Sequence, residues 1–100
     1  MTSIIYSPET LDDIQRILVF LAGQDPELVG KFETDYRKAL QRIRDFPRAW
    51  PKVSKSVRVK VINKRFRYGI YFQYFKRIVF LGAVVHLKQR LSIWKGRFRK

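Results

Sequence analysis

The chain of 100 residues contains no cysteine and a single histidine, His86. The absence of thiols excludes disulfides and thiolate zinc sites, and one imidazole leaves little for any other transition-metal site. We therefore expect no metal and no cofactor. The sequence also has no apolar stretch approaching the ~20 residues of a membrane span, and no N-terminal signal in which a basic region precedes an apolar one. These absences predict a cytoplasmic protein without a membrane partner.

Acidic residues are missing from the second half of the chain. All eight Asp and Glu residues lie in the first 45 positions with six of the 22 Lys and Arg residues, whereas the other sixteen basic residues follow Asp45. The net charge of +14 is thus concentrated in one half. A field of one sign favours a polyanionic partner, which could be nucleic acid, the ribosome or an acidic protein segment. The alternative is an ordinary solvated basic face.

The N-terminal half predicts a short strand, over residues 2–6, followed by two helices. Ser7 is a suitable N-cap for the first helix, with Pro8 at its first position, and Gly23 is expected to end it. Its apolar stripe consists of Leu11, Ile14, Leu18 and Leu21. The opposite, polar side consists of Asp12, Asp13, Gln15 and Arg16.

The second helix is expected to begin at Asp25-Pro26-Glu27 and to continue to about Asp45, antiparallel to the first. Its apolar stripe consists of Val29, Phe32, Tyr36, Leu40 and Ile43. A loop over residues 46–56 follows, in which Trp50 is expected to pack on the core, with base stacking as the alternative.

Three antiparallel strands are predicted in the second half, over residues 57–61, 66–75 and 78–85. The two long ones are separated only by Lys76-Arg77. Apolar residues occur at both odd and even positions of the two long strands, which predicts that both faces of this hairpin are covered, one of them by helices. A hydrophobic content of 46% suits a single domain, residues 1–100. We predict an α+β fold in which an N-terminal strand, a helical hairpin and a three-stranded antiparallel meander form one sheet with helices on one face.

Basic residues on the short strand are the first candidates for function. Strict alternation places Val57, Val59 and Val61 inward and Arg58 and Lys60 outward. The two cations would lie about 6 to 7 Å apart along the strand, a spacing that suits adjacent phosphates. Arg67, on the next strand, could join them if the register allows. A solvated sheet face is the alternative for each of these residues.

His86 lies where a buried strand is expected to emerge among basic residues. A neutral ring at this point could accept a proton from a ribose 2′-hydroxyl as a general base. The second half has no carboxylate to orient that base, and a structural histidine at a strand end is an equal alternative. A Ser-His-Asp site has no support, because the acidic residues are expected on exposed helix positions.

Several motifs together resemble the RelE/ParE superfamily of toxins from type II toxin-antitoxin modules. In chain order they are the segment 6–14, Phe46-Pro47, Trp50-Pro51, Arg65-Phe66 with Tyr68 and Tyr71, the segment 83–86, Arg90, and the Trp94 to Arg97 pattern. The match spans nearly the whole chain, and the family's fold is the one predicted above from periodicity.

The resemblance implies a growth-inhibiting toxin that is neutralised by a cognate antitoxin with an acidic, flexible segment. ParE-like members inhibit DNA gyrase and are not nucleases, whereas RelE-like members are enzymes that cleave mRNA on the ribosome. The Trp50-Pro51, Arg65-Phe66 and Trp94-to-Arg97 motifs resemble ParE, which is our first choice, with plasmid stabilisation among the roles of such modules. A plain nucleic-acid-binding module is a third possibility, although the sequence contains no recognised nucleic-acid motif.

The resemblance also assigns roles to residues. For binding the target or the antitoxin it implies Arg65, Tyr71, Arg90, Trp94 and Arg97. For a RelE-like mRNA interferase it implies Arg58, Lys60, Arg67 and His86 as catalytic residues. This sequence departs from the family in having Arg67 where the Arg-Phe-Pro-Tyr segment has proline, and Leu87 where some ribosome-dependent members have tyrosine. Both departures weigh against a complete nuclease site.

Overall fold

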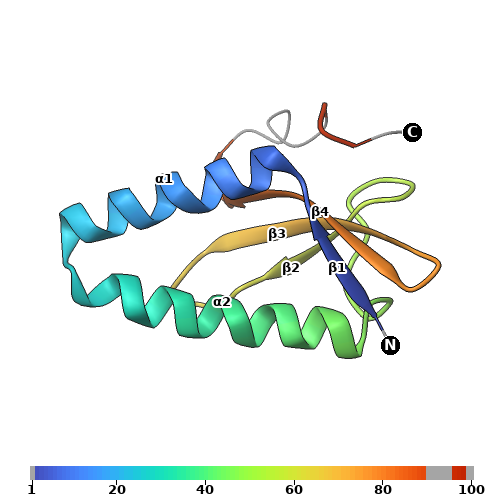
Figure 1. Ribbon diagram of the computed structural model, residues 1–100, viewed down its shortest axis with the longest axis horizontal. Helices are drawn as coiled ribbons and strands as arrows, with labels where there is room; N and C mark the ends of the chain where they lie inside the picture. Colours follow the sequence, from blue (N-terminus) through green and yellow to red (C-terminus); the bar gives the residue numbers. More distant parts are fainter. Residues whose placement is uncertain (1, 90–95, 99–100) are drawn as a thin grey trace.

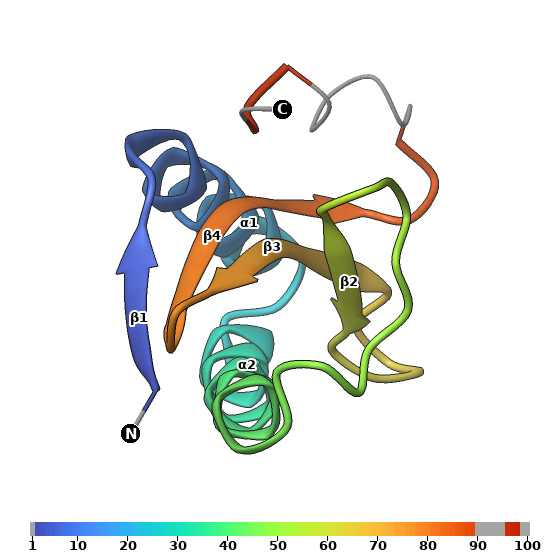
Figure 2. The same ribbon diagram turned by 90° about the vertical axis from the view of Figure 1, so that its right-hand side faces the viewer.

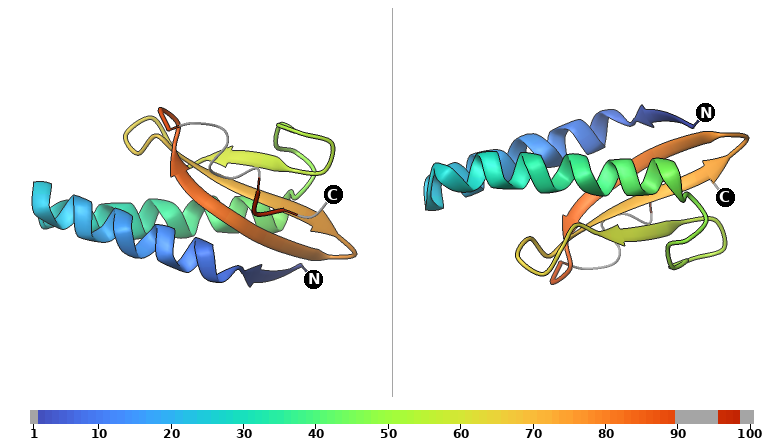
Figure 3. Two further views of the ribbon diagram at one scale, coloured as in Figure 1. Left: turned by 90° about the horizontal axis from the view of Figure 1, so that it is seen from above. Right: turned by 90° about the horizontal axis from the view of Figure 1, so that it is seen from below.

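The computed structural model describes residues 2–89 and 96–98, which form two helices and a four-stranded sheet. In chain order the elements are β1 (Ser3–Tyr6), α1 (Pro8–Gln24), α2 (Glu27–Asp45), β2 (Arg58–Val61), β3 (Tyr68–Phe75) and β4 (Ile78–His86). The two helices lie side by side on one face of the sheet and extend beyond its end (Figures 1 and 3). The predicted α+β fold is therefore confirmed. No helix in the described part is both long and apolar enough to cross a membrane.

The strand order is β1-β4-β3-β2, with β2, β3 and β4 forming the predicted antiparallel meander (Figure 2). The N-terminal strand β1 pairs in parallel with β4, from Ser3 opposite Ile78 to Tyr6 opposite Leu81. The β3–β4 pairing is interrupted by a bulge: Tyr71 lies opposite Ala83 and Phe72 opposite Leu81, which leaves Gly82 as the additional residue. A bulge of this kind disrupts the ladder locally and bends the strand.

The two helices begin as their sequences predict. The Ser7 hydroxyl accepts a hydrogen bond from the amide of Thr10 at 3.1 Å, and Pro8 occupies the first turn of α1. In α2, the Asp25 carboxylate accepts a hydrogen bond from the amide of Glu27 at 3.0 Å. Each oxygen satisfies an amide that has no partner within its helix. The predicted end at Gly23 is wrong by one residue, since α1 continues to Gln24.

The turn between β3 and β4 is the predicted Lys76-Arg77 break. Both residues adopt left-handed backbone angles, with φ of 48° and 65° respectively. Two-residue hairpin turns need such angles because their twist then matches that of the strands, and glycine or asparagine usually supplies them. The turn therefore carries a small conformational strain in a pair of exposed basic residues.

Apolar side chains form a cluster on each face of the sheet. The larger one lies between sheet and helices and includes Phe32 and Ile43 of α2 with Ile70, Phe72 and Leu81 of the strands, all fully buried. The second cluster lies on the opposite face, and its buried members are Val57, Tyr71, Ala83 and Val85, with Val59 and Phe98 packed against them. Both faces of the β3–β4 hairpin are therefore covered, as predicted.

The buried face of α1 differs from the predicted stripe. Its buried residues are Thr10, Asp13, Ile17 and Leu21, whereas Leu11, at 56% exposure, faces solvent. Asp13, expected on the exposed side, is only 3% exposed. The expectation that all acidic residues are exposed is therefore wrong, and the cause lies in what α1 packs against.

The side chains of α1 complete the edge of β4 beyond the point where β1 ends. The Thr10 hydroxyl donates to the carbonyl of Leu81 at 3.0 Å, and the Asp13 carboxylate accepts from the amide of Val84 at 3.0 Å. The backbone amide of Ser7 also donates to the carbonyl of Leu81 at 3.0 Å. Buried backbone groups without a strand partner need such bonds. A polar stripe thus faces the bulged part of β4.

Residues 96–98 lie against this same region from the other side. The Arg97 Nη1 atom donates to Asp13 Oδ2 at 2.5 Å, the same oxygen that accepts from the Val84 amide. The Phe98 ring covers Gly82 so closely that a Cβ at that position would overlap it. The other Asp13 oxygen, Oδ1, accepts from Arg16 at 2.7 Å. We call the contacts of Asp13, Gly82, Val84 and Arg97 the α1–β4 junction.

Candidate functional site

Arg58 and Lys60 do not lie on an open face of the sheet. They alternate with the valines as predicted, but they pair with Phe72 and Ile70, whose side chains belong to the cluster under the helices. Residues that pair across strands point to the same face, so both cations face the helix side. The expected outward orientation is wrong because the valines are needed by the second cluster on the opposite face.

Trp50 explains how two cations are accommodated on the helix side. The Arg58 guanidinium donates to the carbonyl of Trp50 at 2.8 Å, and the Lys60 ammonium lies 4.8 Å from the centre of the Trp50 ring. The guanidinium carbon of Arg42, from α2, lies 5.8 Å from the same ring. Trp50 packs against the larger cluster, which agrees with its predicted structural role.

Of the cations near Trp50, Lys60 and Arg42 repel each other. Burial lowers the pKa of Lys60, and the neighbouring charge of Arg42 lowers it further. The Lys60 ammonium donates to the carbonyl of Val61 at 2.7 Å. Two cations near one aromatic ring each gain from the ring but repel one another.

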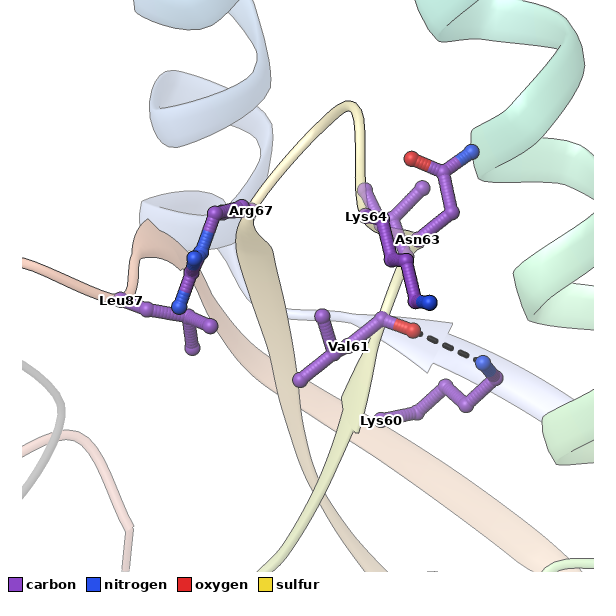
Figure 4. Close-up of a pocket in the computed structure, with 7 residues that line it drawn as sticks. Lys60, Val61, Asn63, Lys64, Arg67 and Leu87 are labelled. Atoms are coloured by element: carbon purple, nitrogen blue, oxygen red, sulfur yellow. Dashed lines mark hydrogen bonds between the residues drawn. The ribbon is translucent and has the colours of Figure 1, made fainter.

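An open hollow of about 710 Å³ lies beside Lys60, where β2 turns into β3. It is lined by Lys60, Val61, Ile62, Asn63, Lys64, Arg67 and Leu87. Figure 4 shows Lys60 reaching towards α2, and Arg67 with Leu87 across from Lys64. A smaller hollow of about 210 Å³ adjoins it towards α2, lined by Asp35, Lys38, Ala39, Arg42, Lys60, Ile62 and Asn63. We call the two together the β2 groove, because Lys60, Ile62 and Asn63 line both.

The four residues proposed for an interferase site have different surroundings. Lys60 and Arg67 line the groove, and the Arg58 guanidinium is bonded to a backbone carbonyl. His86 lies at the end of β4 opposite Tyr68 of β3, and its ring packs edge-on against that of Tyr68 at 5.2 Å. The residue after it, Leu87, lines the groove. The Nδ1 atom of His86 accepts a hydrogen bond from the amide of Lys88 at 3.0 Å.

The residues proposed for target or antitoxin binding are also dispersed. Arg65 is exposed on the β2–β3 turn. Tyr71 is only 4% exposed within the second cluster, and burial raises its pKa. Arg97 is held by Asp13. Arg90 and Trp94 lie outside the described residues.

Sequence reasoning missed several members of these sites, among them Asp13, Lys38, Arg42 and Lys64. Asp13 follows Ser7 and Thr10 at intervals of three, and a polar stripe of this spacing on a helix that must pack on a sheet is a usable signal. Lys38 and Arg42 are four residues apart on α2, so they project from the same face towards β2. Only the position of β2 makes that face part of a groove.

The fold is similar to that of a solved structure, whereas comparison of the sequence with family models and curated proteins finds no match. A solved structure described as the chromosomal ParDE TA system from P. aeruginosa is similar over 88% of this chain and 98% of that chain, with a TM-score of 0.68 and 14% sequence identity. The chain therefore has the ParE-like fold that its motifs predicted.

Proposed function

We propose that the chain is the toxin of a type II toxin-antitoxin module, that it inhibits growth by binding DNA gyrase, and that an antitoxin with an acidic segment neutralises it. Its motifs resemble ParE, and its fold is similar to that of a chain from a ParDE system. In this role the protein is an inhibitor that binds its target and is not an enzyme.

The different surroundings of the candidate residues support binding over catalysis. A general base must come within hydrogen-bond reach of the proton that it removes, and the charges that stabilise the transition state must surround the same point. His86 lies at the end of β4, the Arg58 guanidinium is bonded to the carbonyl of Trp50, and only Lys60 and Arg67 share the groove. An inhibitor that acts by binding needs a surface and no such convergence.

A gyrase supercoiling assay tests the proposal. Relaxed plasmid, purified gyrase and ATP are mixed with increasing amounts of the purified chain, and supercoiled product is resolved on a gel. We expect supercoiling to fall as the chain is added. The exposed residue Arg65 provides a target variant, Arg65→Glu, and Lys55→Glu is the matched control with the same change in charge. Full supercoiling at a large excess of folded protein would contradict the proposal.

A ribosome-dependent mRNA interferase is the second candidate, and the basic lining of the β2 groove favours it. Lys60, Lys64 and Arg67 face a hollow that contains no acidic residue. The test is a translation extract with one defined mRNA, in which new 5′ ends are mapped after addition of the chain. Cuts within codons that depend on ribosomes would establish the enzyme and overturn the gyrase proposal. An intact message with normal translation would exclude the interferase.

A further inference from the structure

The β2 groove combines an apolar floor with basic walls. In the larger hollow the apolar members are Val61, Ile62 and Leu87, and the charged members are Lys60, Lys64 and Arg67. Val61 and Leu87 are each 36% exposed, so their methyl groups are accessible to a ligand. The groove therefore offers two kinds of contact side by side: apolar surface to bury and positive charge to neutralise.

The cations of the groove have no carboxylate partner of their own. Both ion pairs in the described part of the chain belong to Asp13, on α1. Asp35 is the one carboxylate that lines the groove, and it accepts a hydrogen bond from the Asn63 amide at 2.6 Å. Lys60 and Arg42 meanwhile both lie over the ring of Trp50, at 4.8 Å and 5.8 Å from its centre. An incoming anion would relieve the repulsion between them.

We propose that the β2 groove binds a protein segment in which carboxylate side chains alternate with apolar ones. Carboxylates of this segment pair with Lys60, Lys64 and Arg67, and its apolar side chains cover Val61, Ile62 and Leu87. The identification of this segment with the antitoxin rests on the proposed function. The groove's preference for an acidic and apolar segment rests on its lining alone.

Two other occupants fit the lining less well. Single-stranded nucleic acid is usually held by aromatic rings on which bases stack, and among residues 2–89 and 96–98 no aromatic side chain lines either hollow of the groove. A second copy of the chain is disfavoured because a net charge of +14 on each molecule opposes their approach. An acidic segment with apolar residues uses both parts of the lining.

The first experiment titrates the ¹⁵N-labelled protein with a synthetic capped peptide of alternating Glu and Leu. We expect chemical-shift changes at the amides of Ile62, Asn63 and Leu87 and at the Asn63 side chain. A peptide of alternating Gln and Leu serves as the matched probe without charge. If the Gln peptide bound as tightly as the Glu peptide, the proposed role of the basic walls would be wrong.

Paired variants separate the groove from general attraction between opposite charges. The groove variant carries Lys64→Glu and Arg67→Glu, and the control carries Lys31→Glu and Lys55→Glu, exposed residues that do not line the groove. The two have equal net charge. We expect the groove variant to bind the Glu peptide about tenfold or more weakly, and the control about twofold more weakly. Equal losses would overturn the proposal.

A short single-stranded oligonucleotide is the third probe. Tighter binding of the oligonucleotide than of the Glu peptide, with the same dependence on Lys64 and Arg67, would overturn the assignment to a protein segment. Thermal unfolding of each variant shows that it is folded. The result is independent of the gyrase assay: a failure to inhibit gyrase leaves peptide binding in the groove intact, and a failure of peptide binding leaves gyrase inhibition intact.

Discussion

The α1–β4 junction and the β2 groove hold charged side chains in opposite ways. At the junction, one carboxylate with 3% exposure accepts bonds from two arginines and a backbone amide. In the groove, Lys60 and Arg42 lie near one indole ring, and the nearest lining carboxylate is bonded to Asn63. Removing one partner of a buried charge whose bonds are made within the fold is destabilising, whereas charges without a counterion remain available to a partner.

The difference between the regions follows from their places in the sheet. The junction lies where β1 ends and a bulge interrupts β4, so backbone groups there need side-chain partners. The groove lies at the other edge of the sheet, beside β2, where the chain turns through residues 62–67. The first site is closed by α1 and residues 96–98, and the second is open to solvent. We therefore expect substitutions to affect folding at the junction and binding at the groove.

Replacing the junction carboxylate should have the largest effect. Asp13→Ala leaves the amide of Val84 without its acceptor and Arg97 with only the carbonyl of Gly82, at 3.4 Å, and breaking a buried ion pair costs about 3 to 5 kcal/mol. Urea unfolding followed by circular dichroism measures the change. The control is Asp12→Ala on the exposed side of α1, for which we expect a change within about 0.5 kcal/mol. If the two variants lowered the free energy of unfolding equally, the contacts of the α1–β4 junction would not contribute to stability as proposed.

A Cβ at Gly82 should have the next largest effect. Gly82→Ala forces the Phe98 ring away from the second cluster, and overpacking of this kind costs about 1 to 3 kcal/mol. Gly23→Ala is the matched control, because no atom lies within 4 Å of a Cβ there and the helix gains about 0.5 to 1 kcal/mol. Thermal unfolding of both variants gives the comparison.

The Phe98→Ala background checks the physical reason for the Gly82 effect. In that background the ring is absent, so Gly82→Ala should cost much less than in the natural chain. A cost that is the same in both backgrounds would mean that Phe98 is not the cause.

Replacing Lys60 should have the smallest effect. It is expected as a change in how the free energy of unfolding depends on pH. The lowered pKa of Lys60 means that the unfolded chain holds this proton more tightly than the folded protein does. Below the folded pKa the buried charge opposes folding, and this cost is removed as the pH rises from that value to the ordinary 10.5. Lys60→Met has no such proton. The free energy of unfolding of the natural chain should therefore rise relative to Lys60→Met between pH 7 and about 10.

The free energy of unfolding of the natural chain must be compared with that of Lys60→Met at each pH, because buried tyrosines change the stability in the opposite direction. Burial raises the pKa of Tyr36, Tyr68 and Tyr71 above the ordinary 10.0, so the unfolded chain loses these protons first and stability falls as the pH passes 10.0. Both proteins share this fall. A difference between them that stays constant with pH would contradict the lowered pKa of Lys60.

The order and type of the elements could be read from local signals. Ser7 and Pro8 begin α1 because a hydroxyl and an imino acid suit the first turn of any helix. Lys76-Arg77 ends β3 because it is the only polar break between two long apolar runs. These signals act over a few residues, so no knowledge of the fold is needed to interpret them.

The direction of Arg58 and Lys60 could not be read in the same way. Alternation separates the side chains of β2 into two sets, but apolar surface covers both faces of this sheet. Hydrophobicity then cannot tell which set faces the helices. The register with Ile70 and Phe72 decides it. For the same reason the groove, which joins residues of α2, β2 and the end of β4, could not be assembled from the sequence.

The sequence by itself determined the α+β class, the helical hairpin and the antiparallel meander, since capping, periodicity and turn residues act locally. It also determined the strongly basic character of the second half, from which a polyanionic partner is predicted, because this charge is a sum over residues. Only the tertiary structure decided that β1 pairs with β4, that Asp13 is buried and that Lys60 faces Trp50. Each of these depends on backbone groups and side chains far apart in the chain, whose need for partners arises only when the sheet has formed.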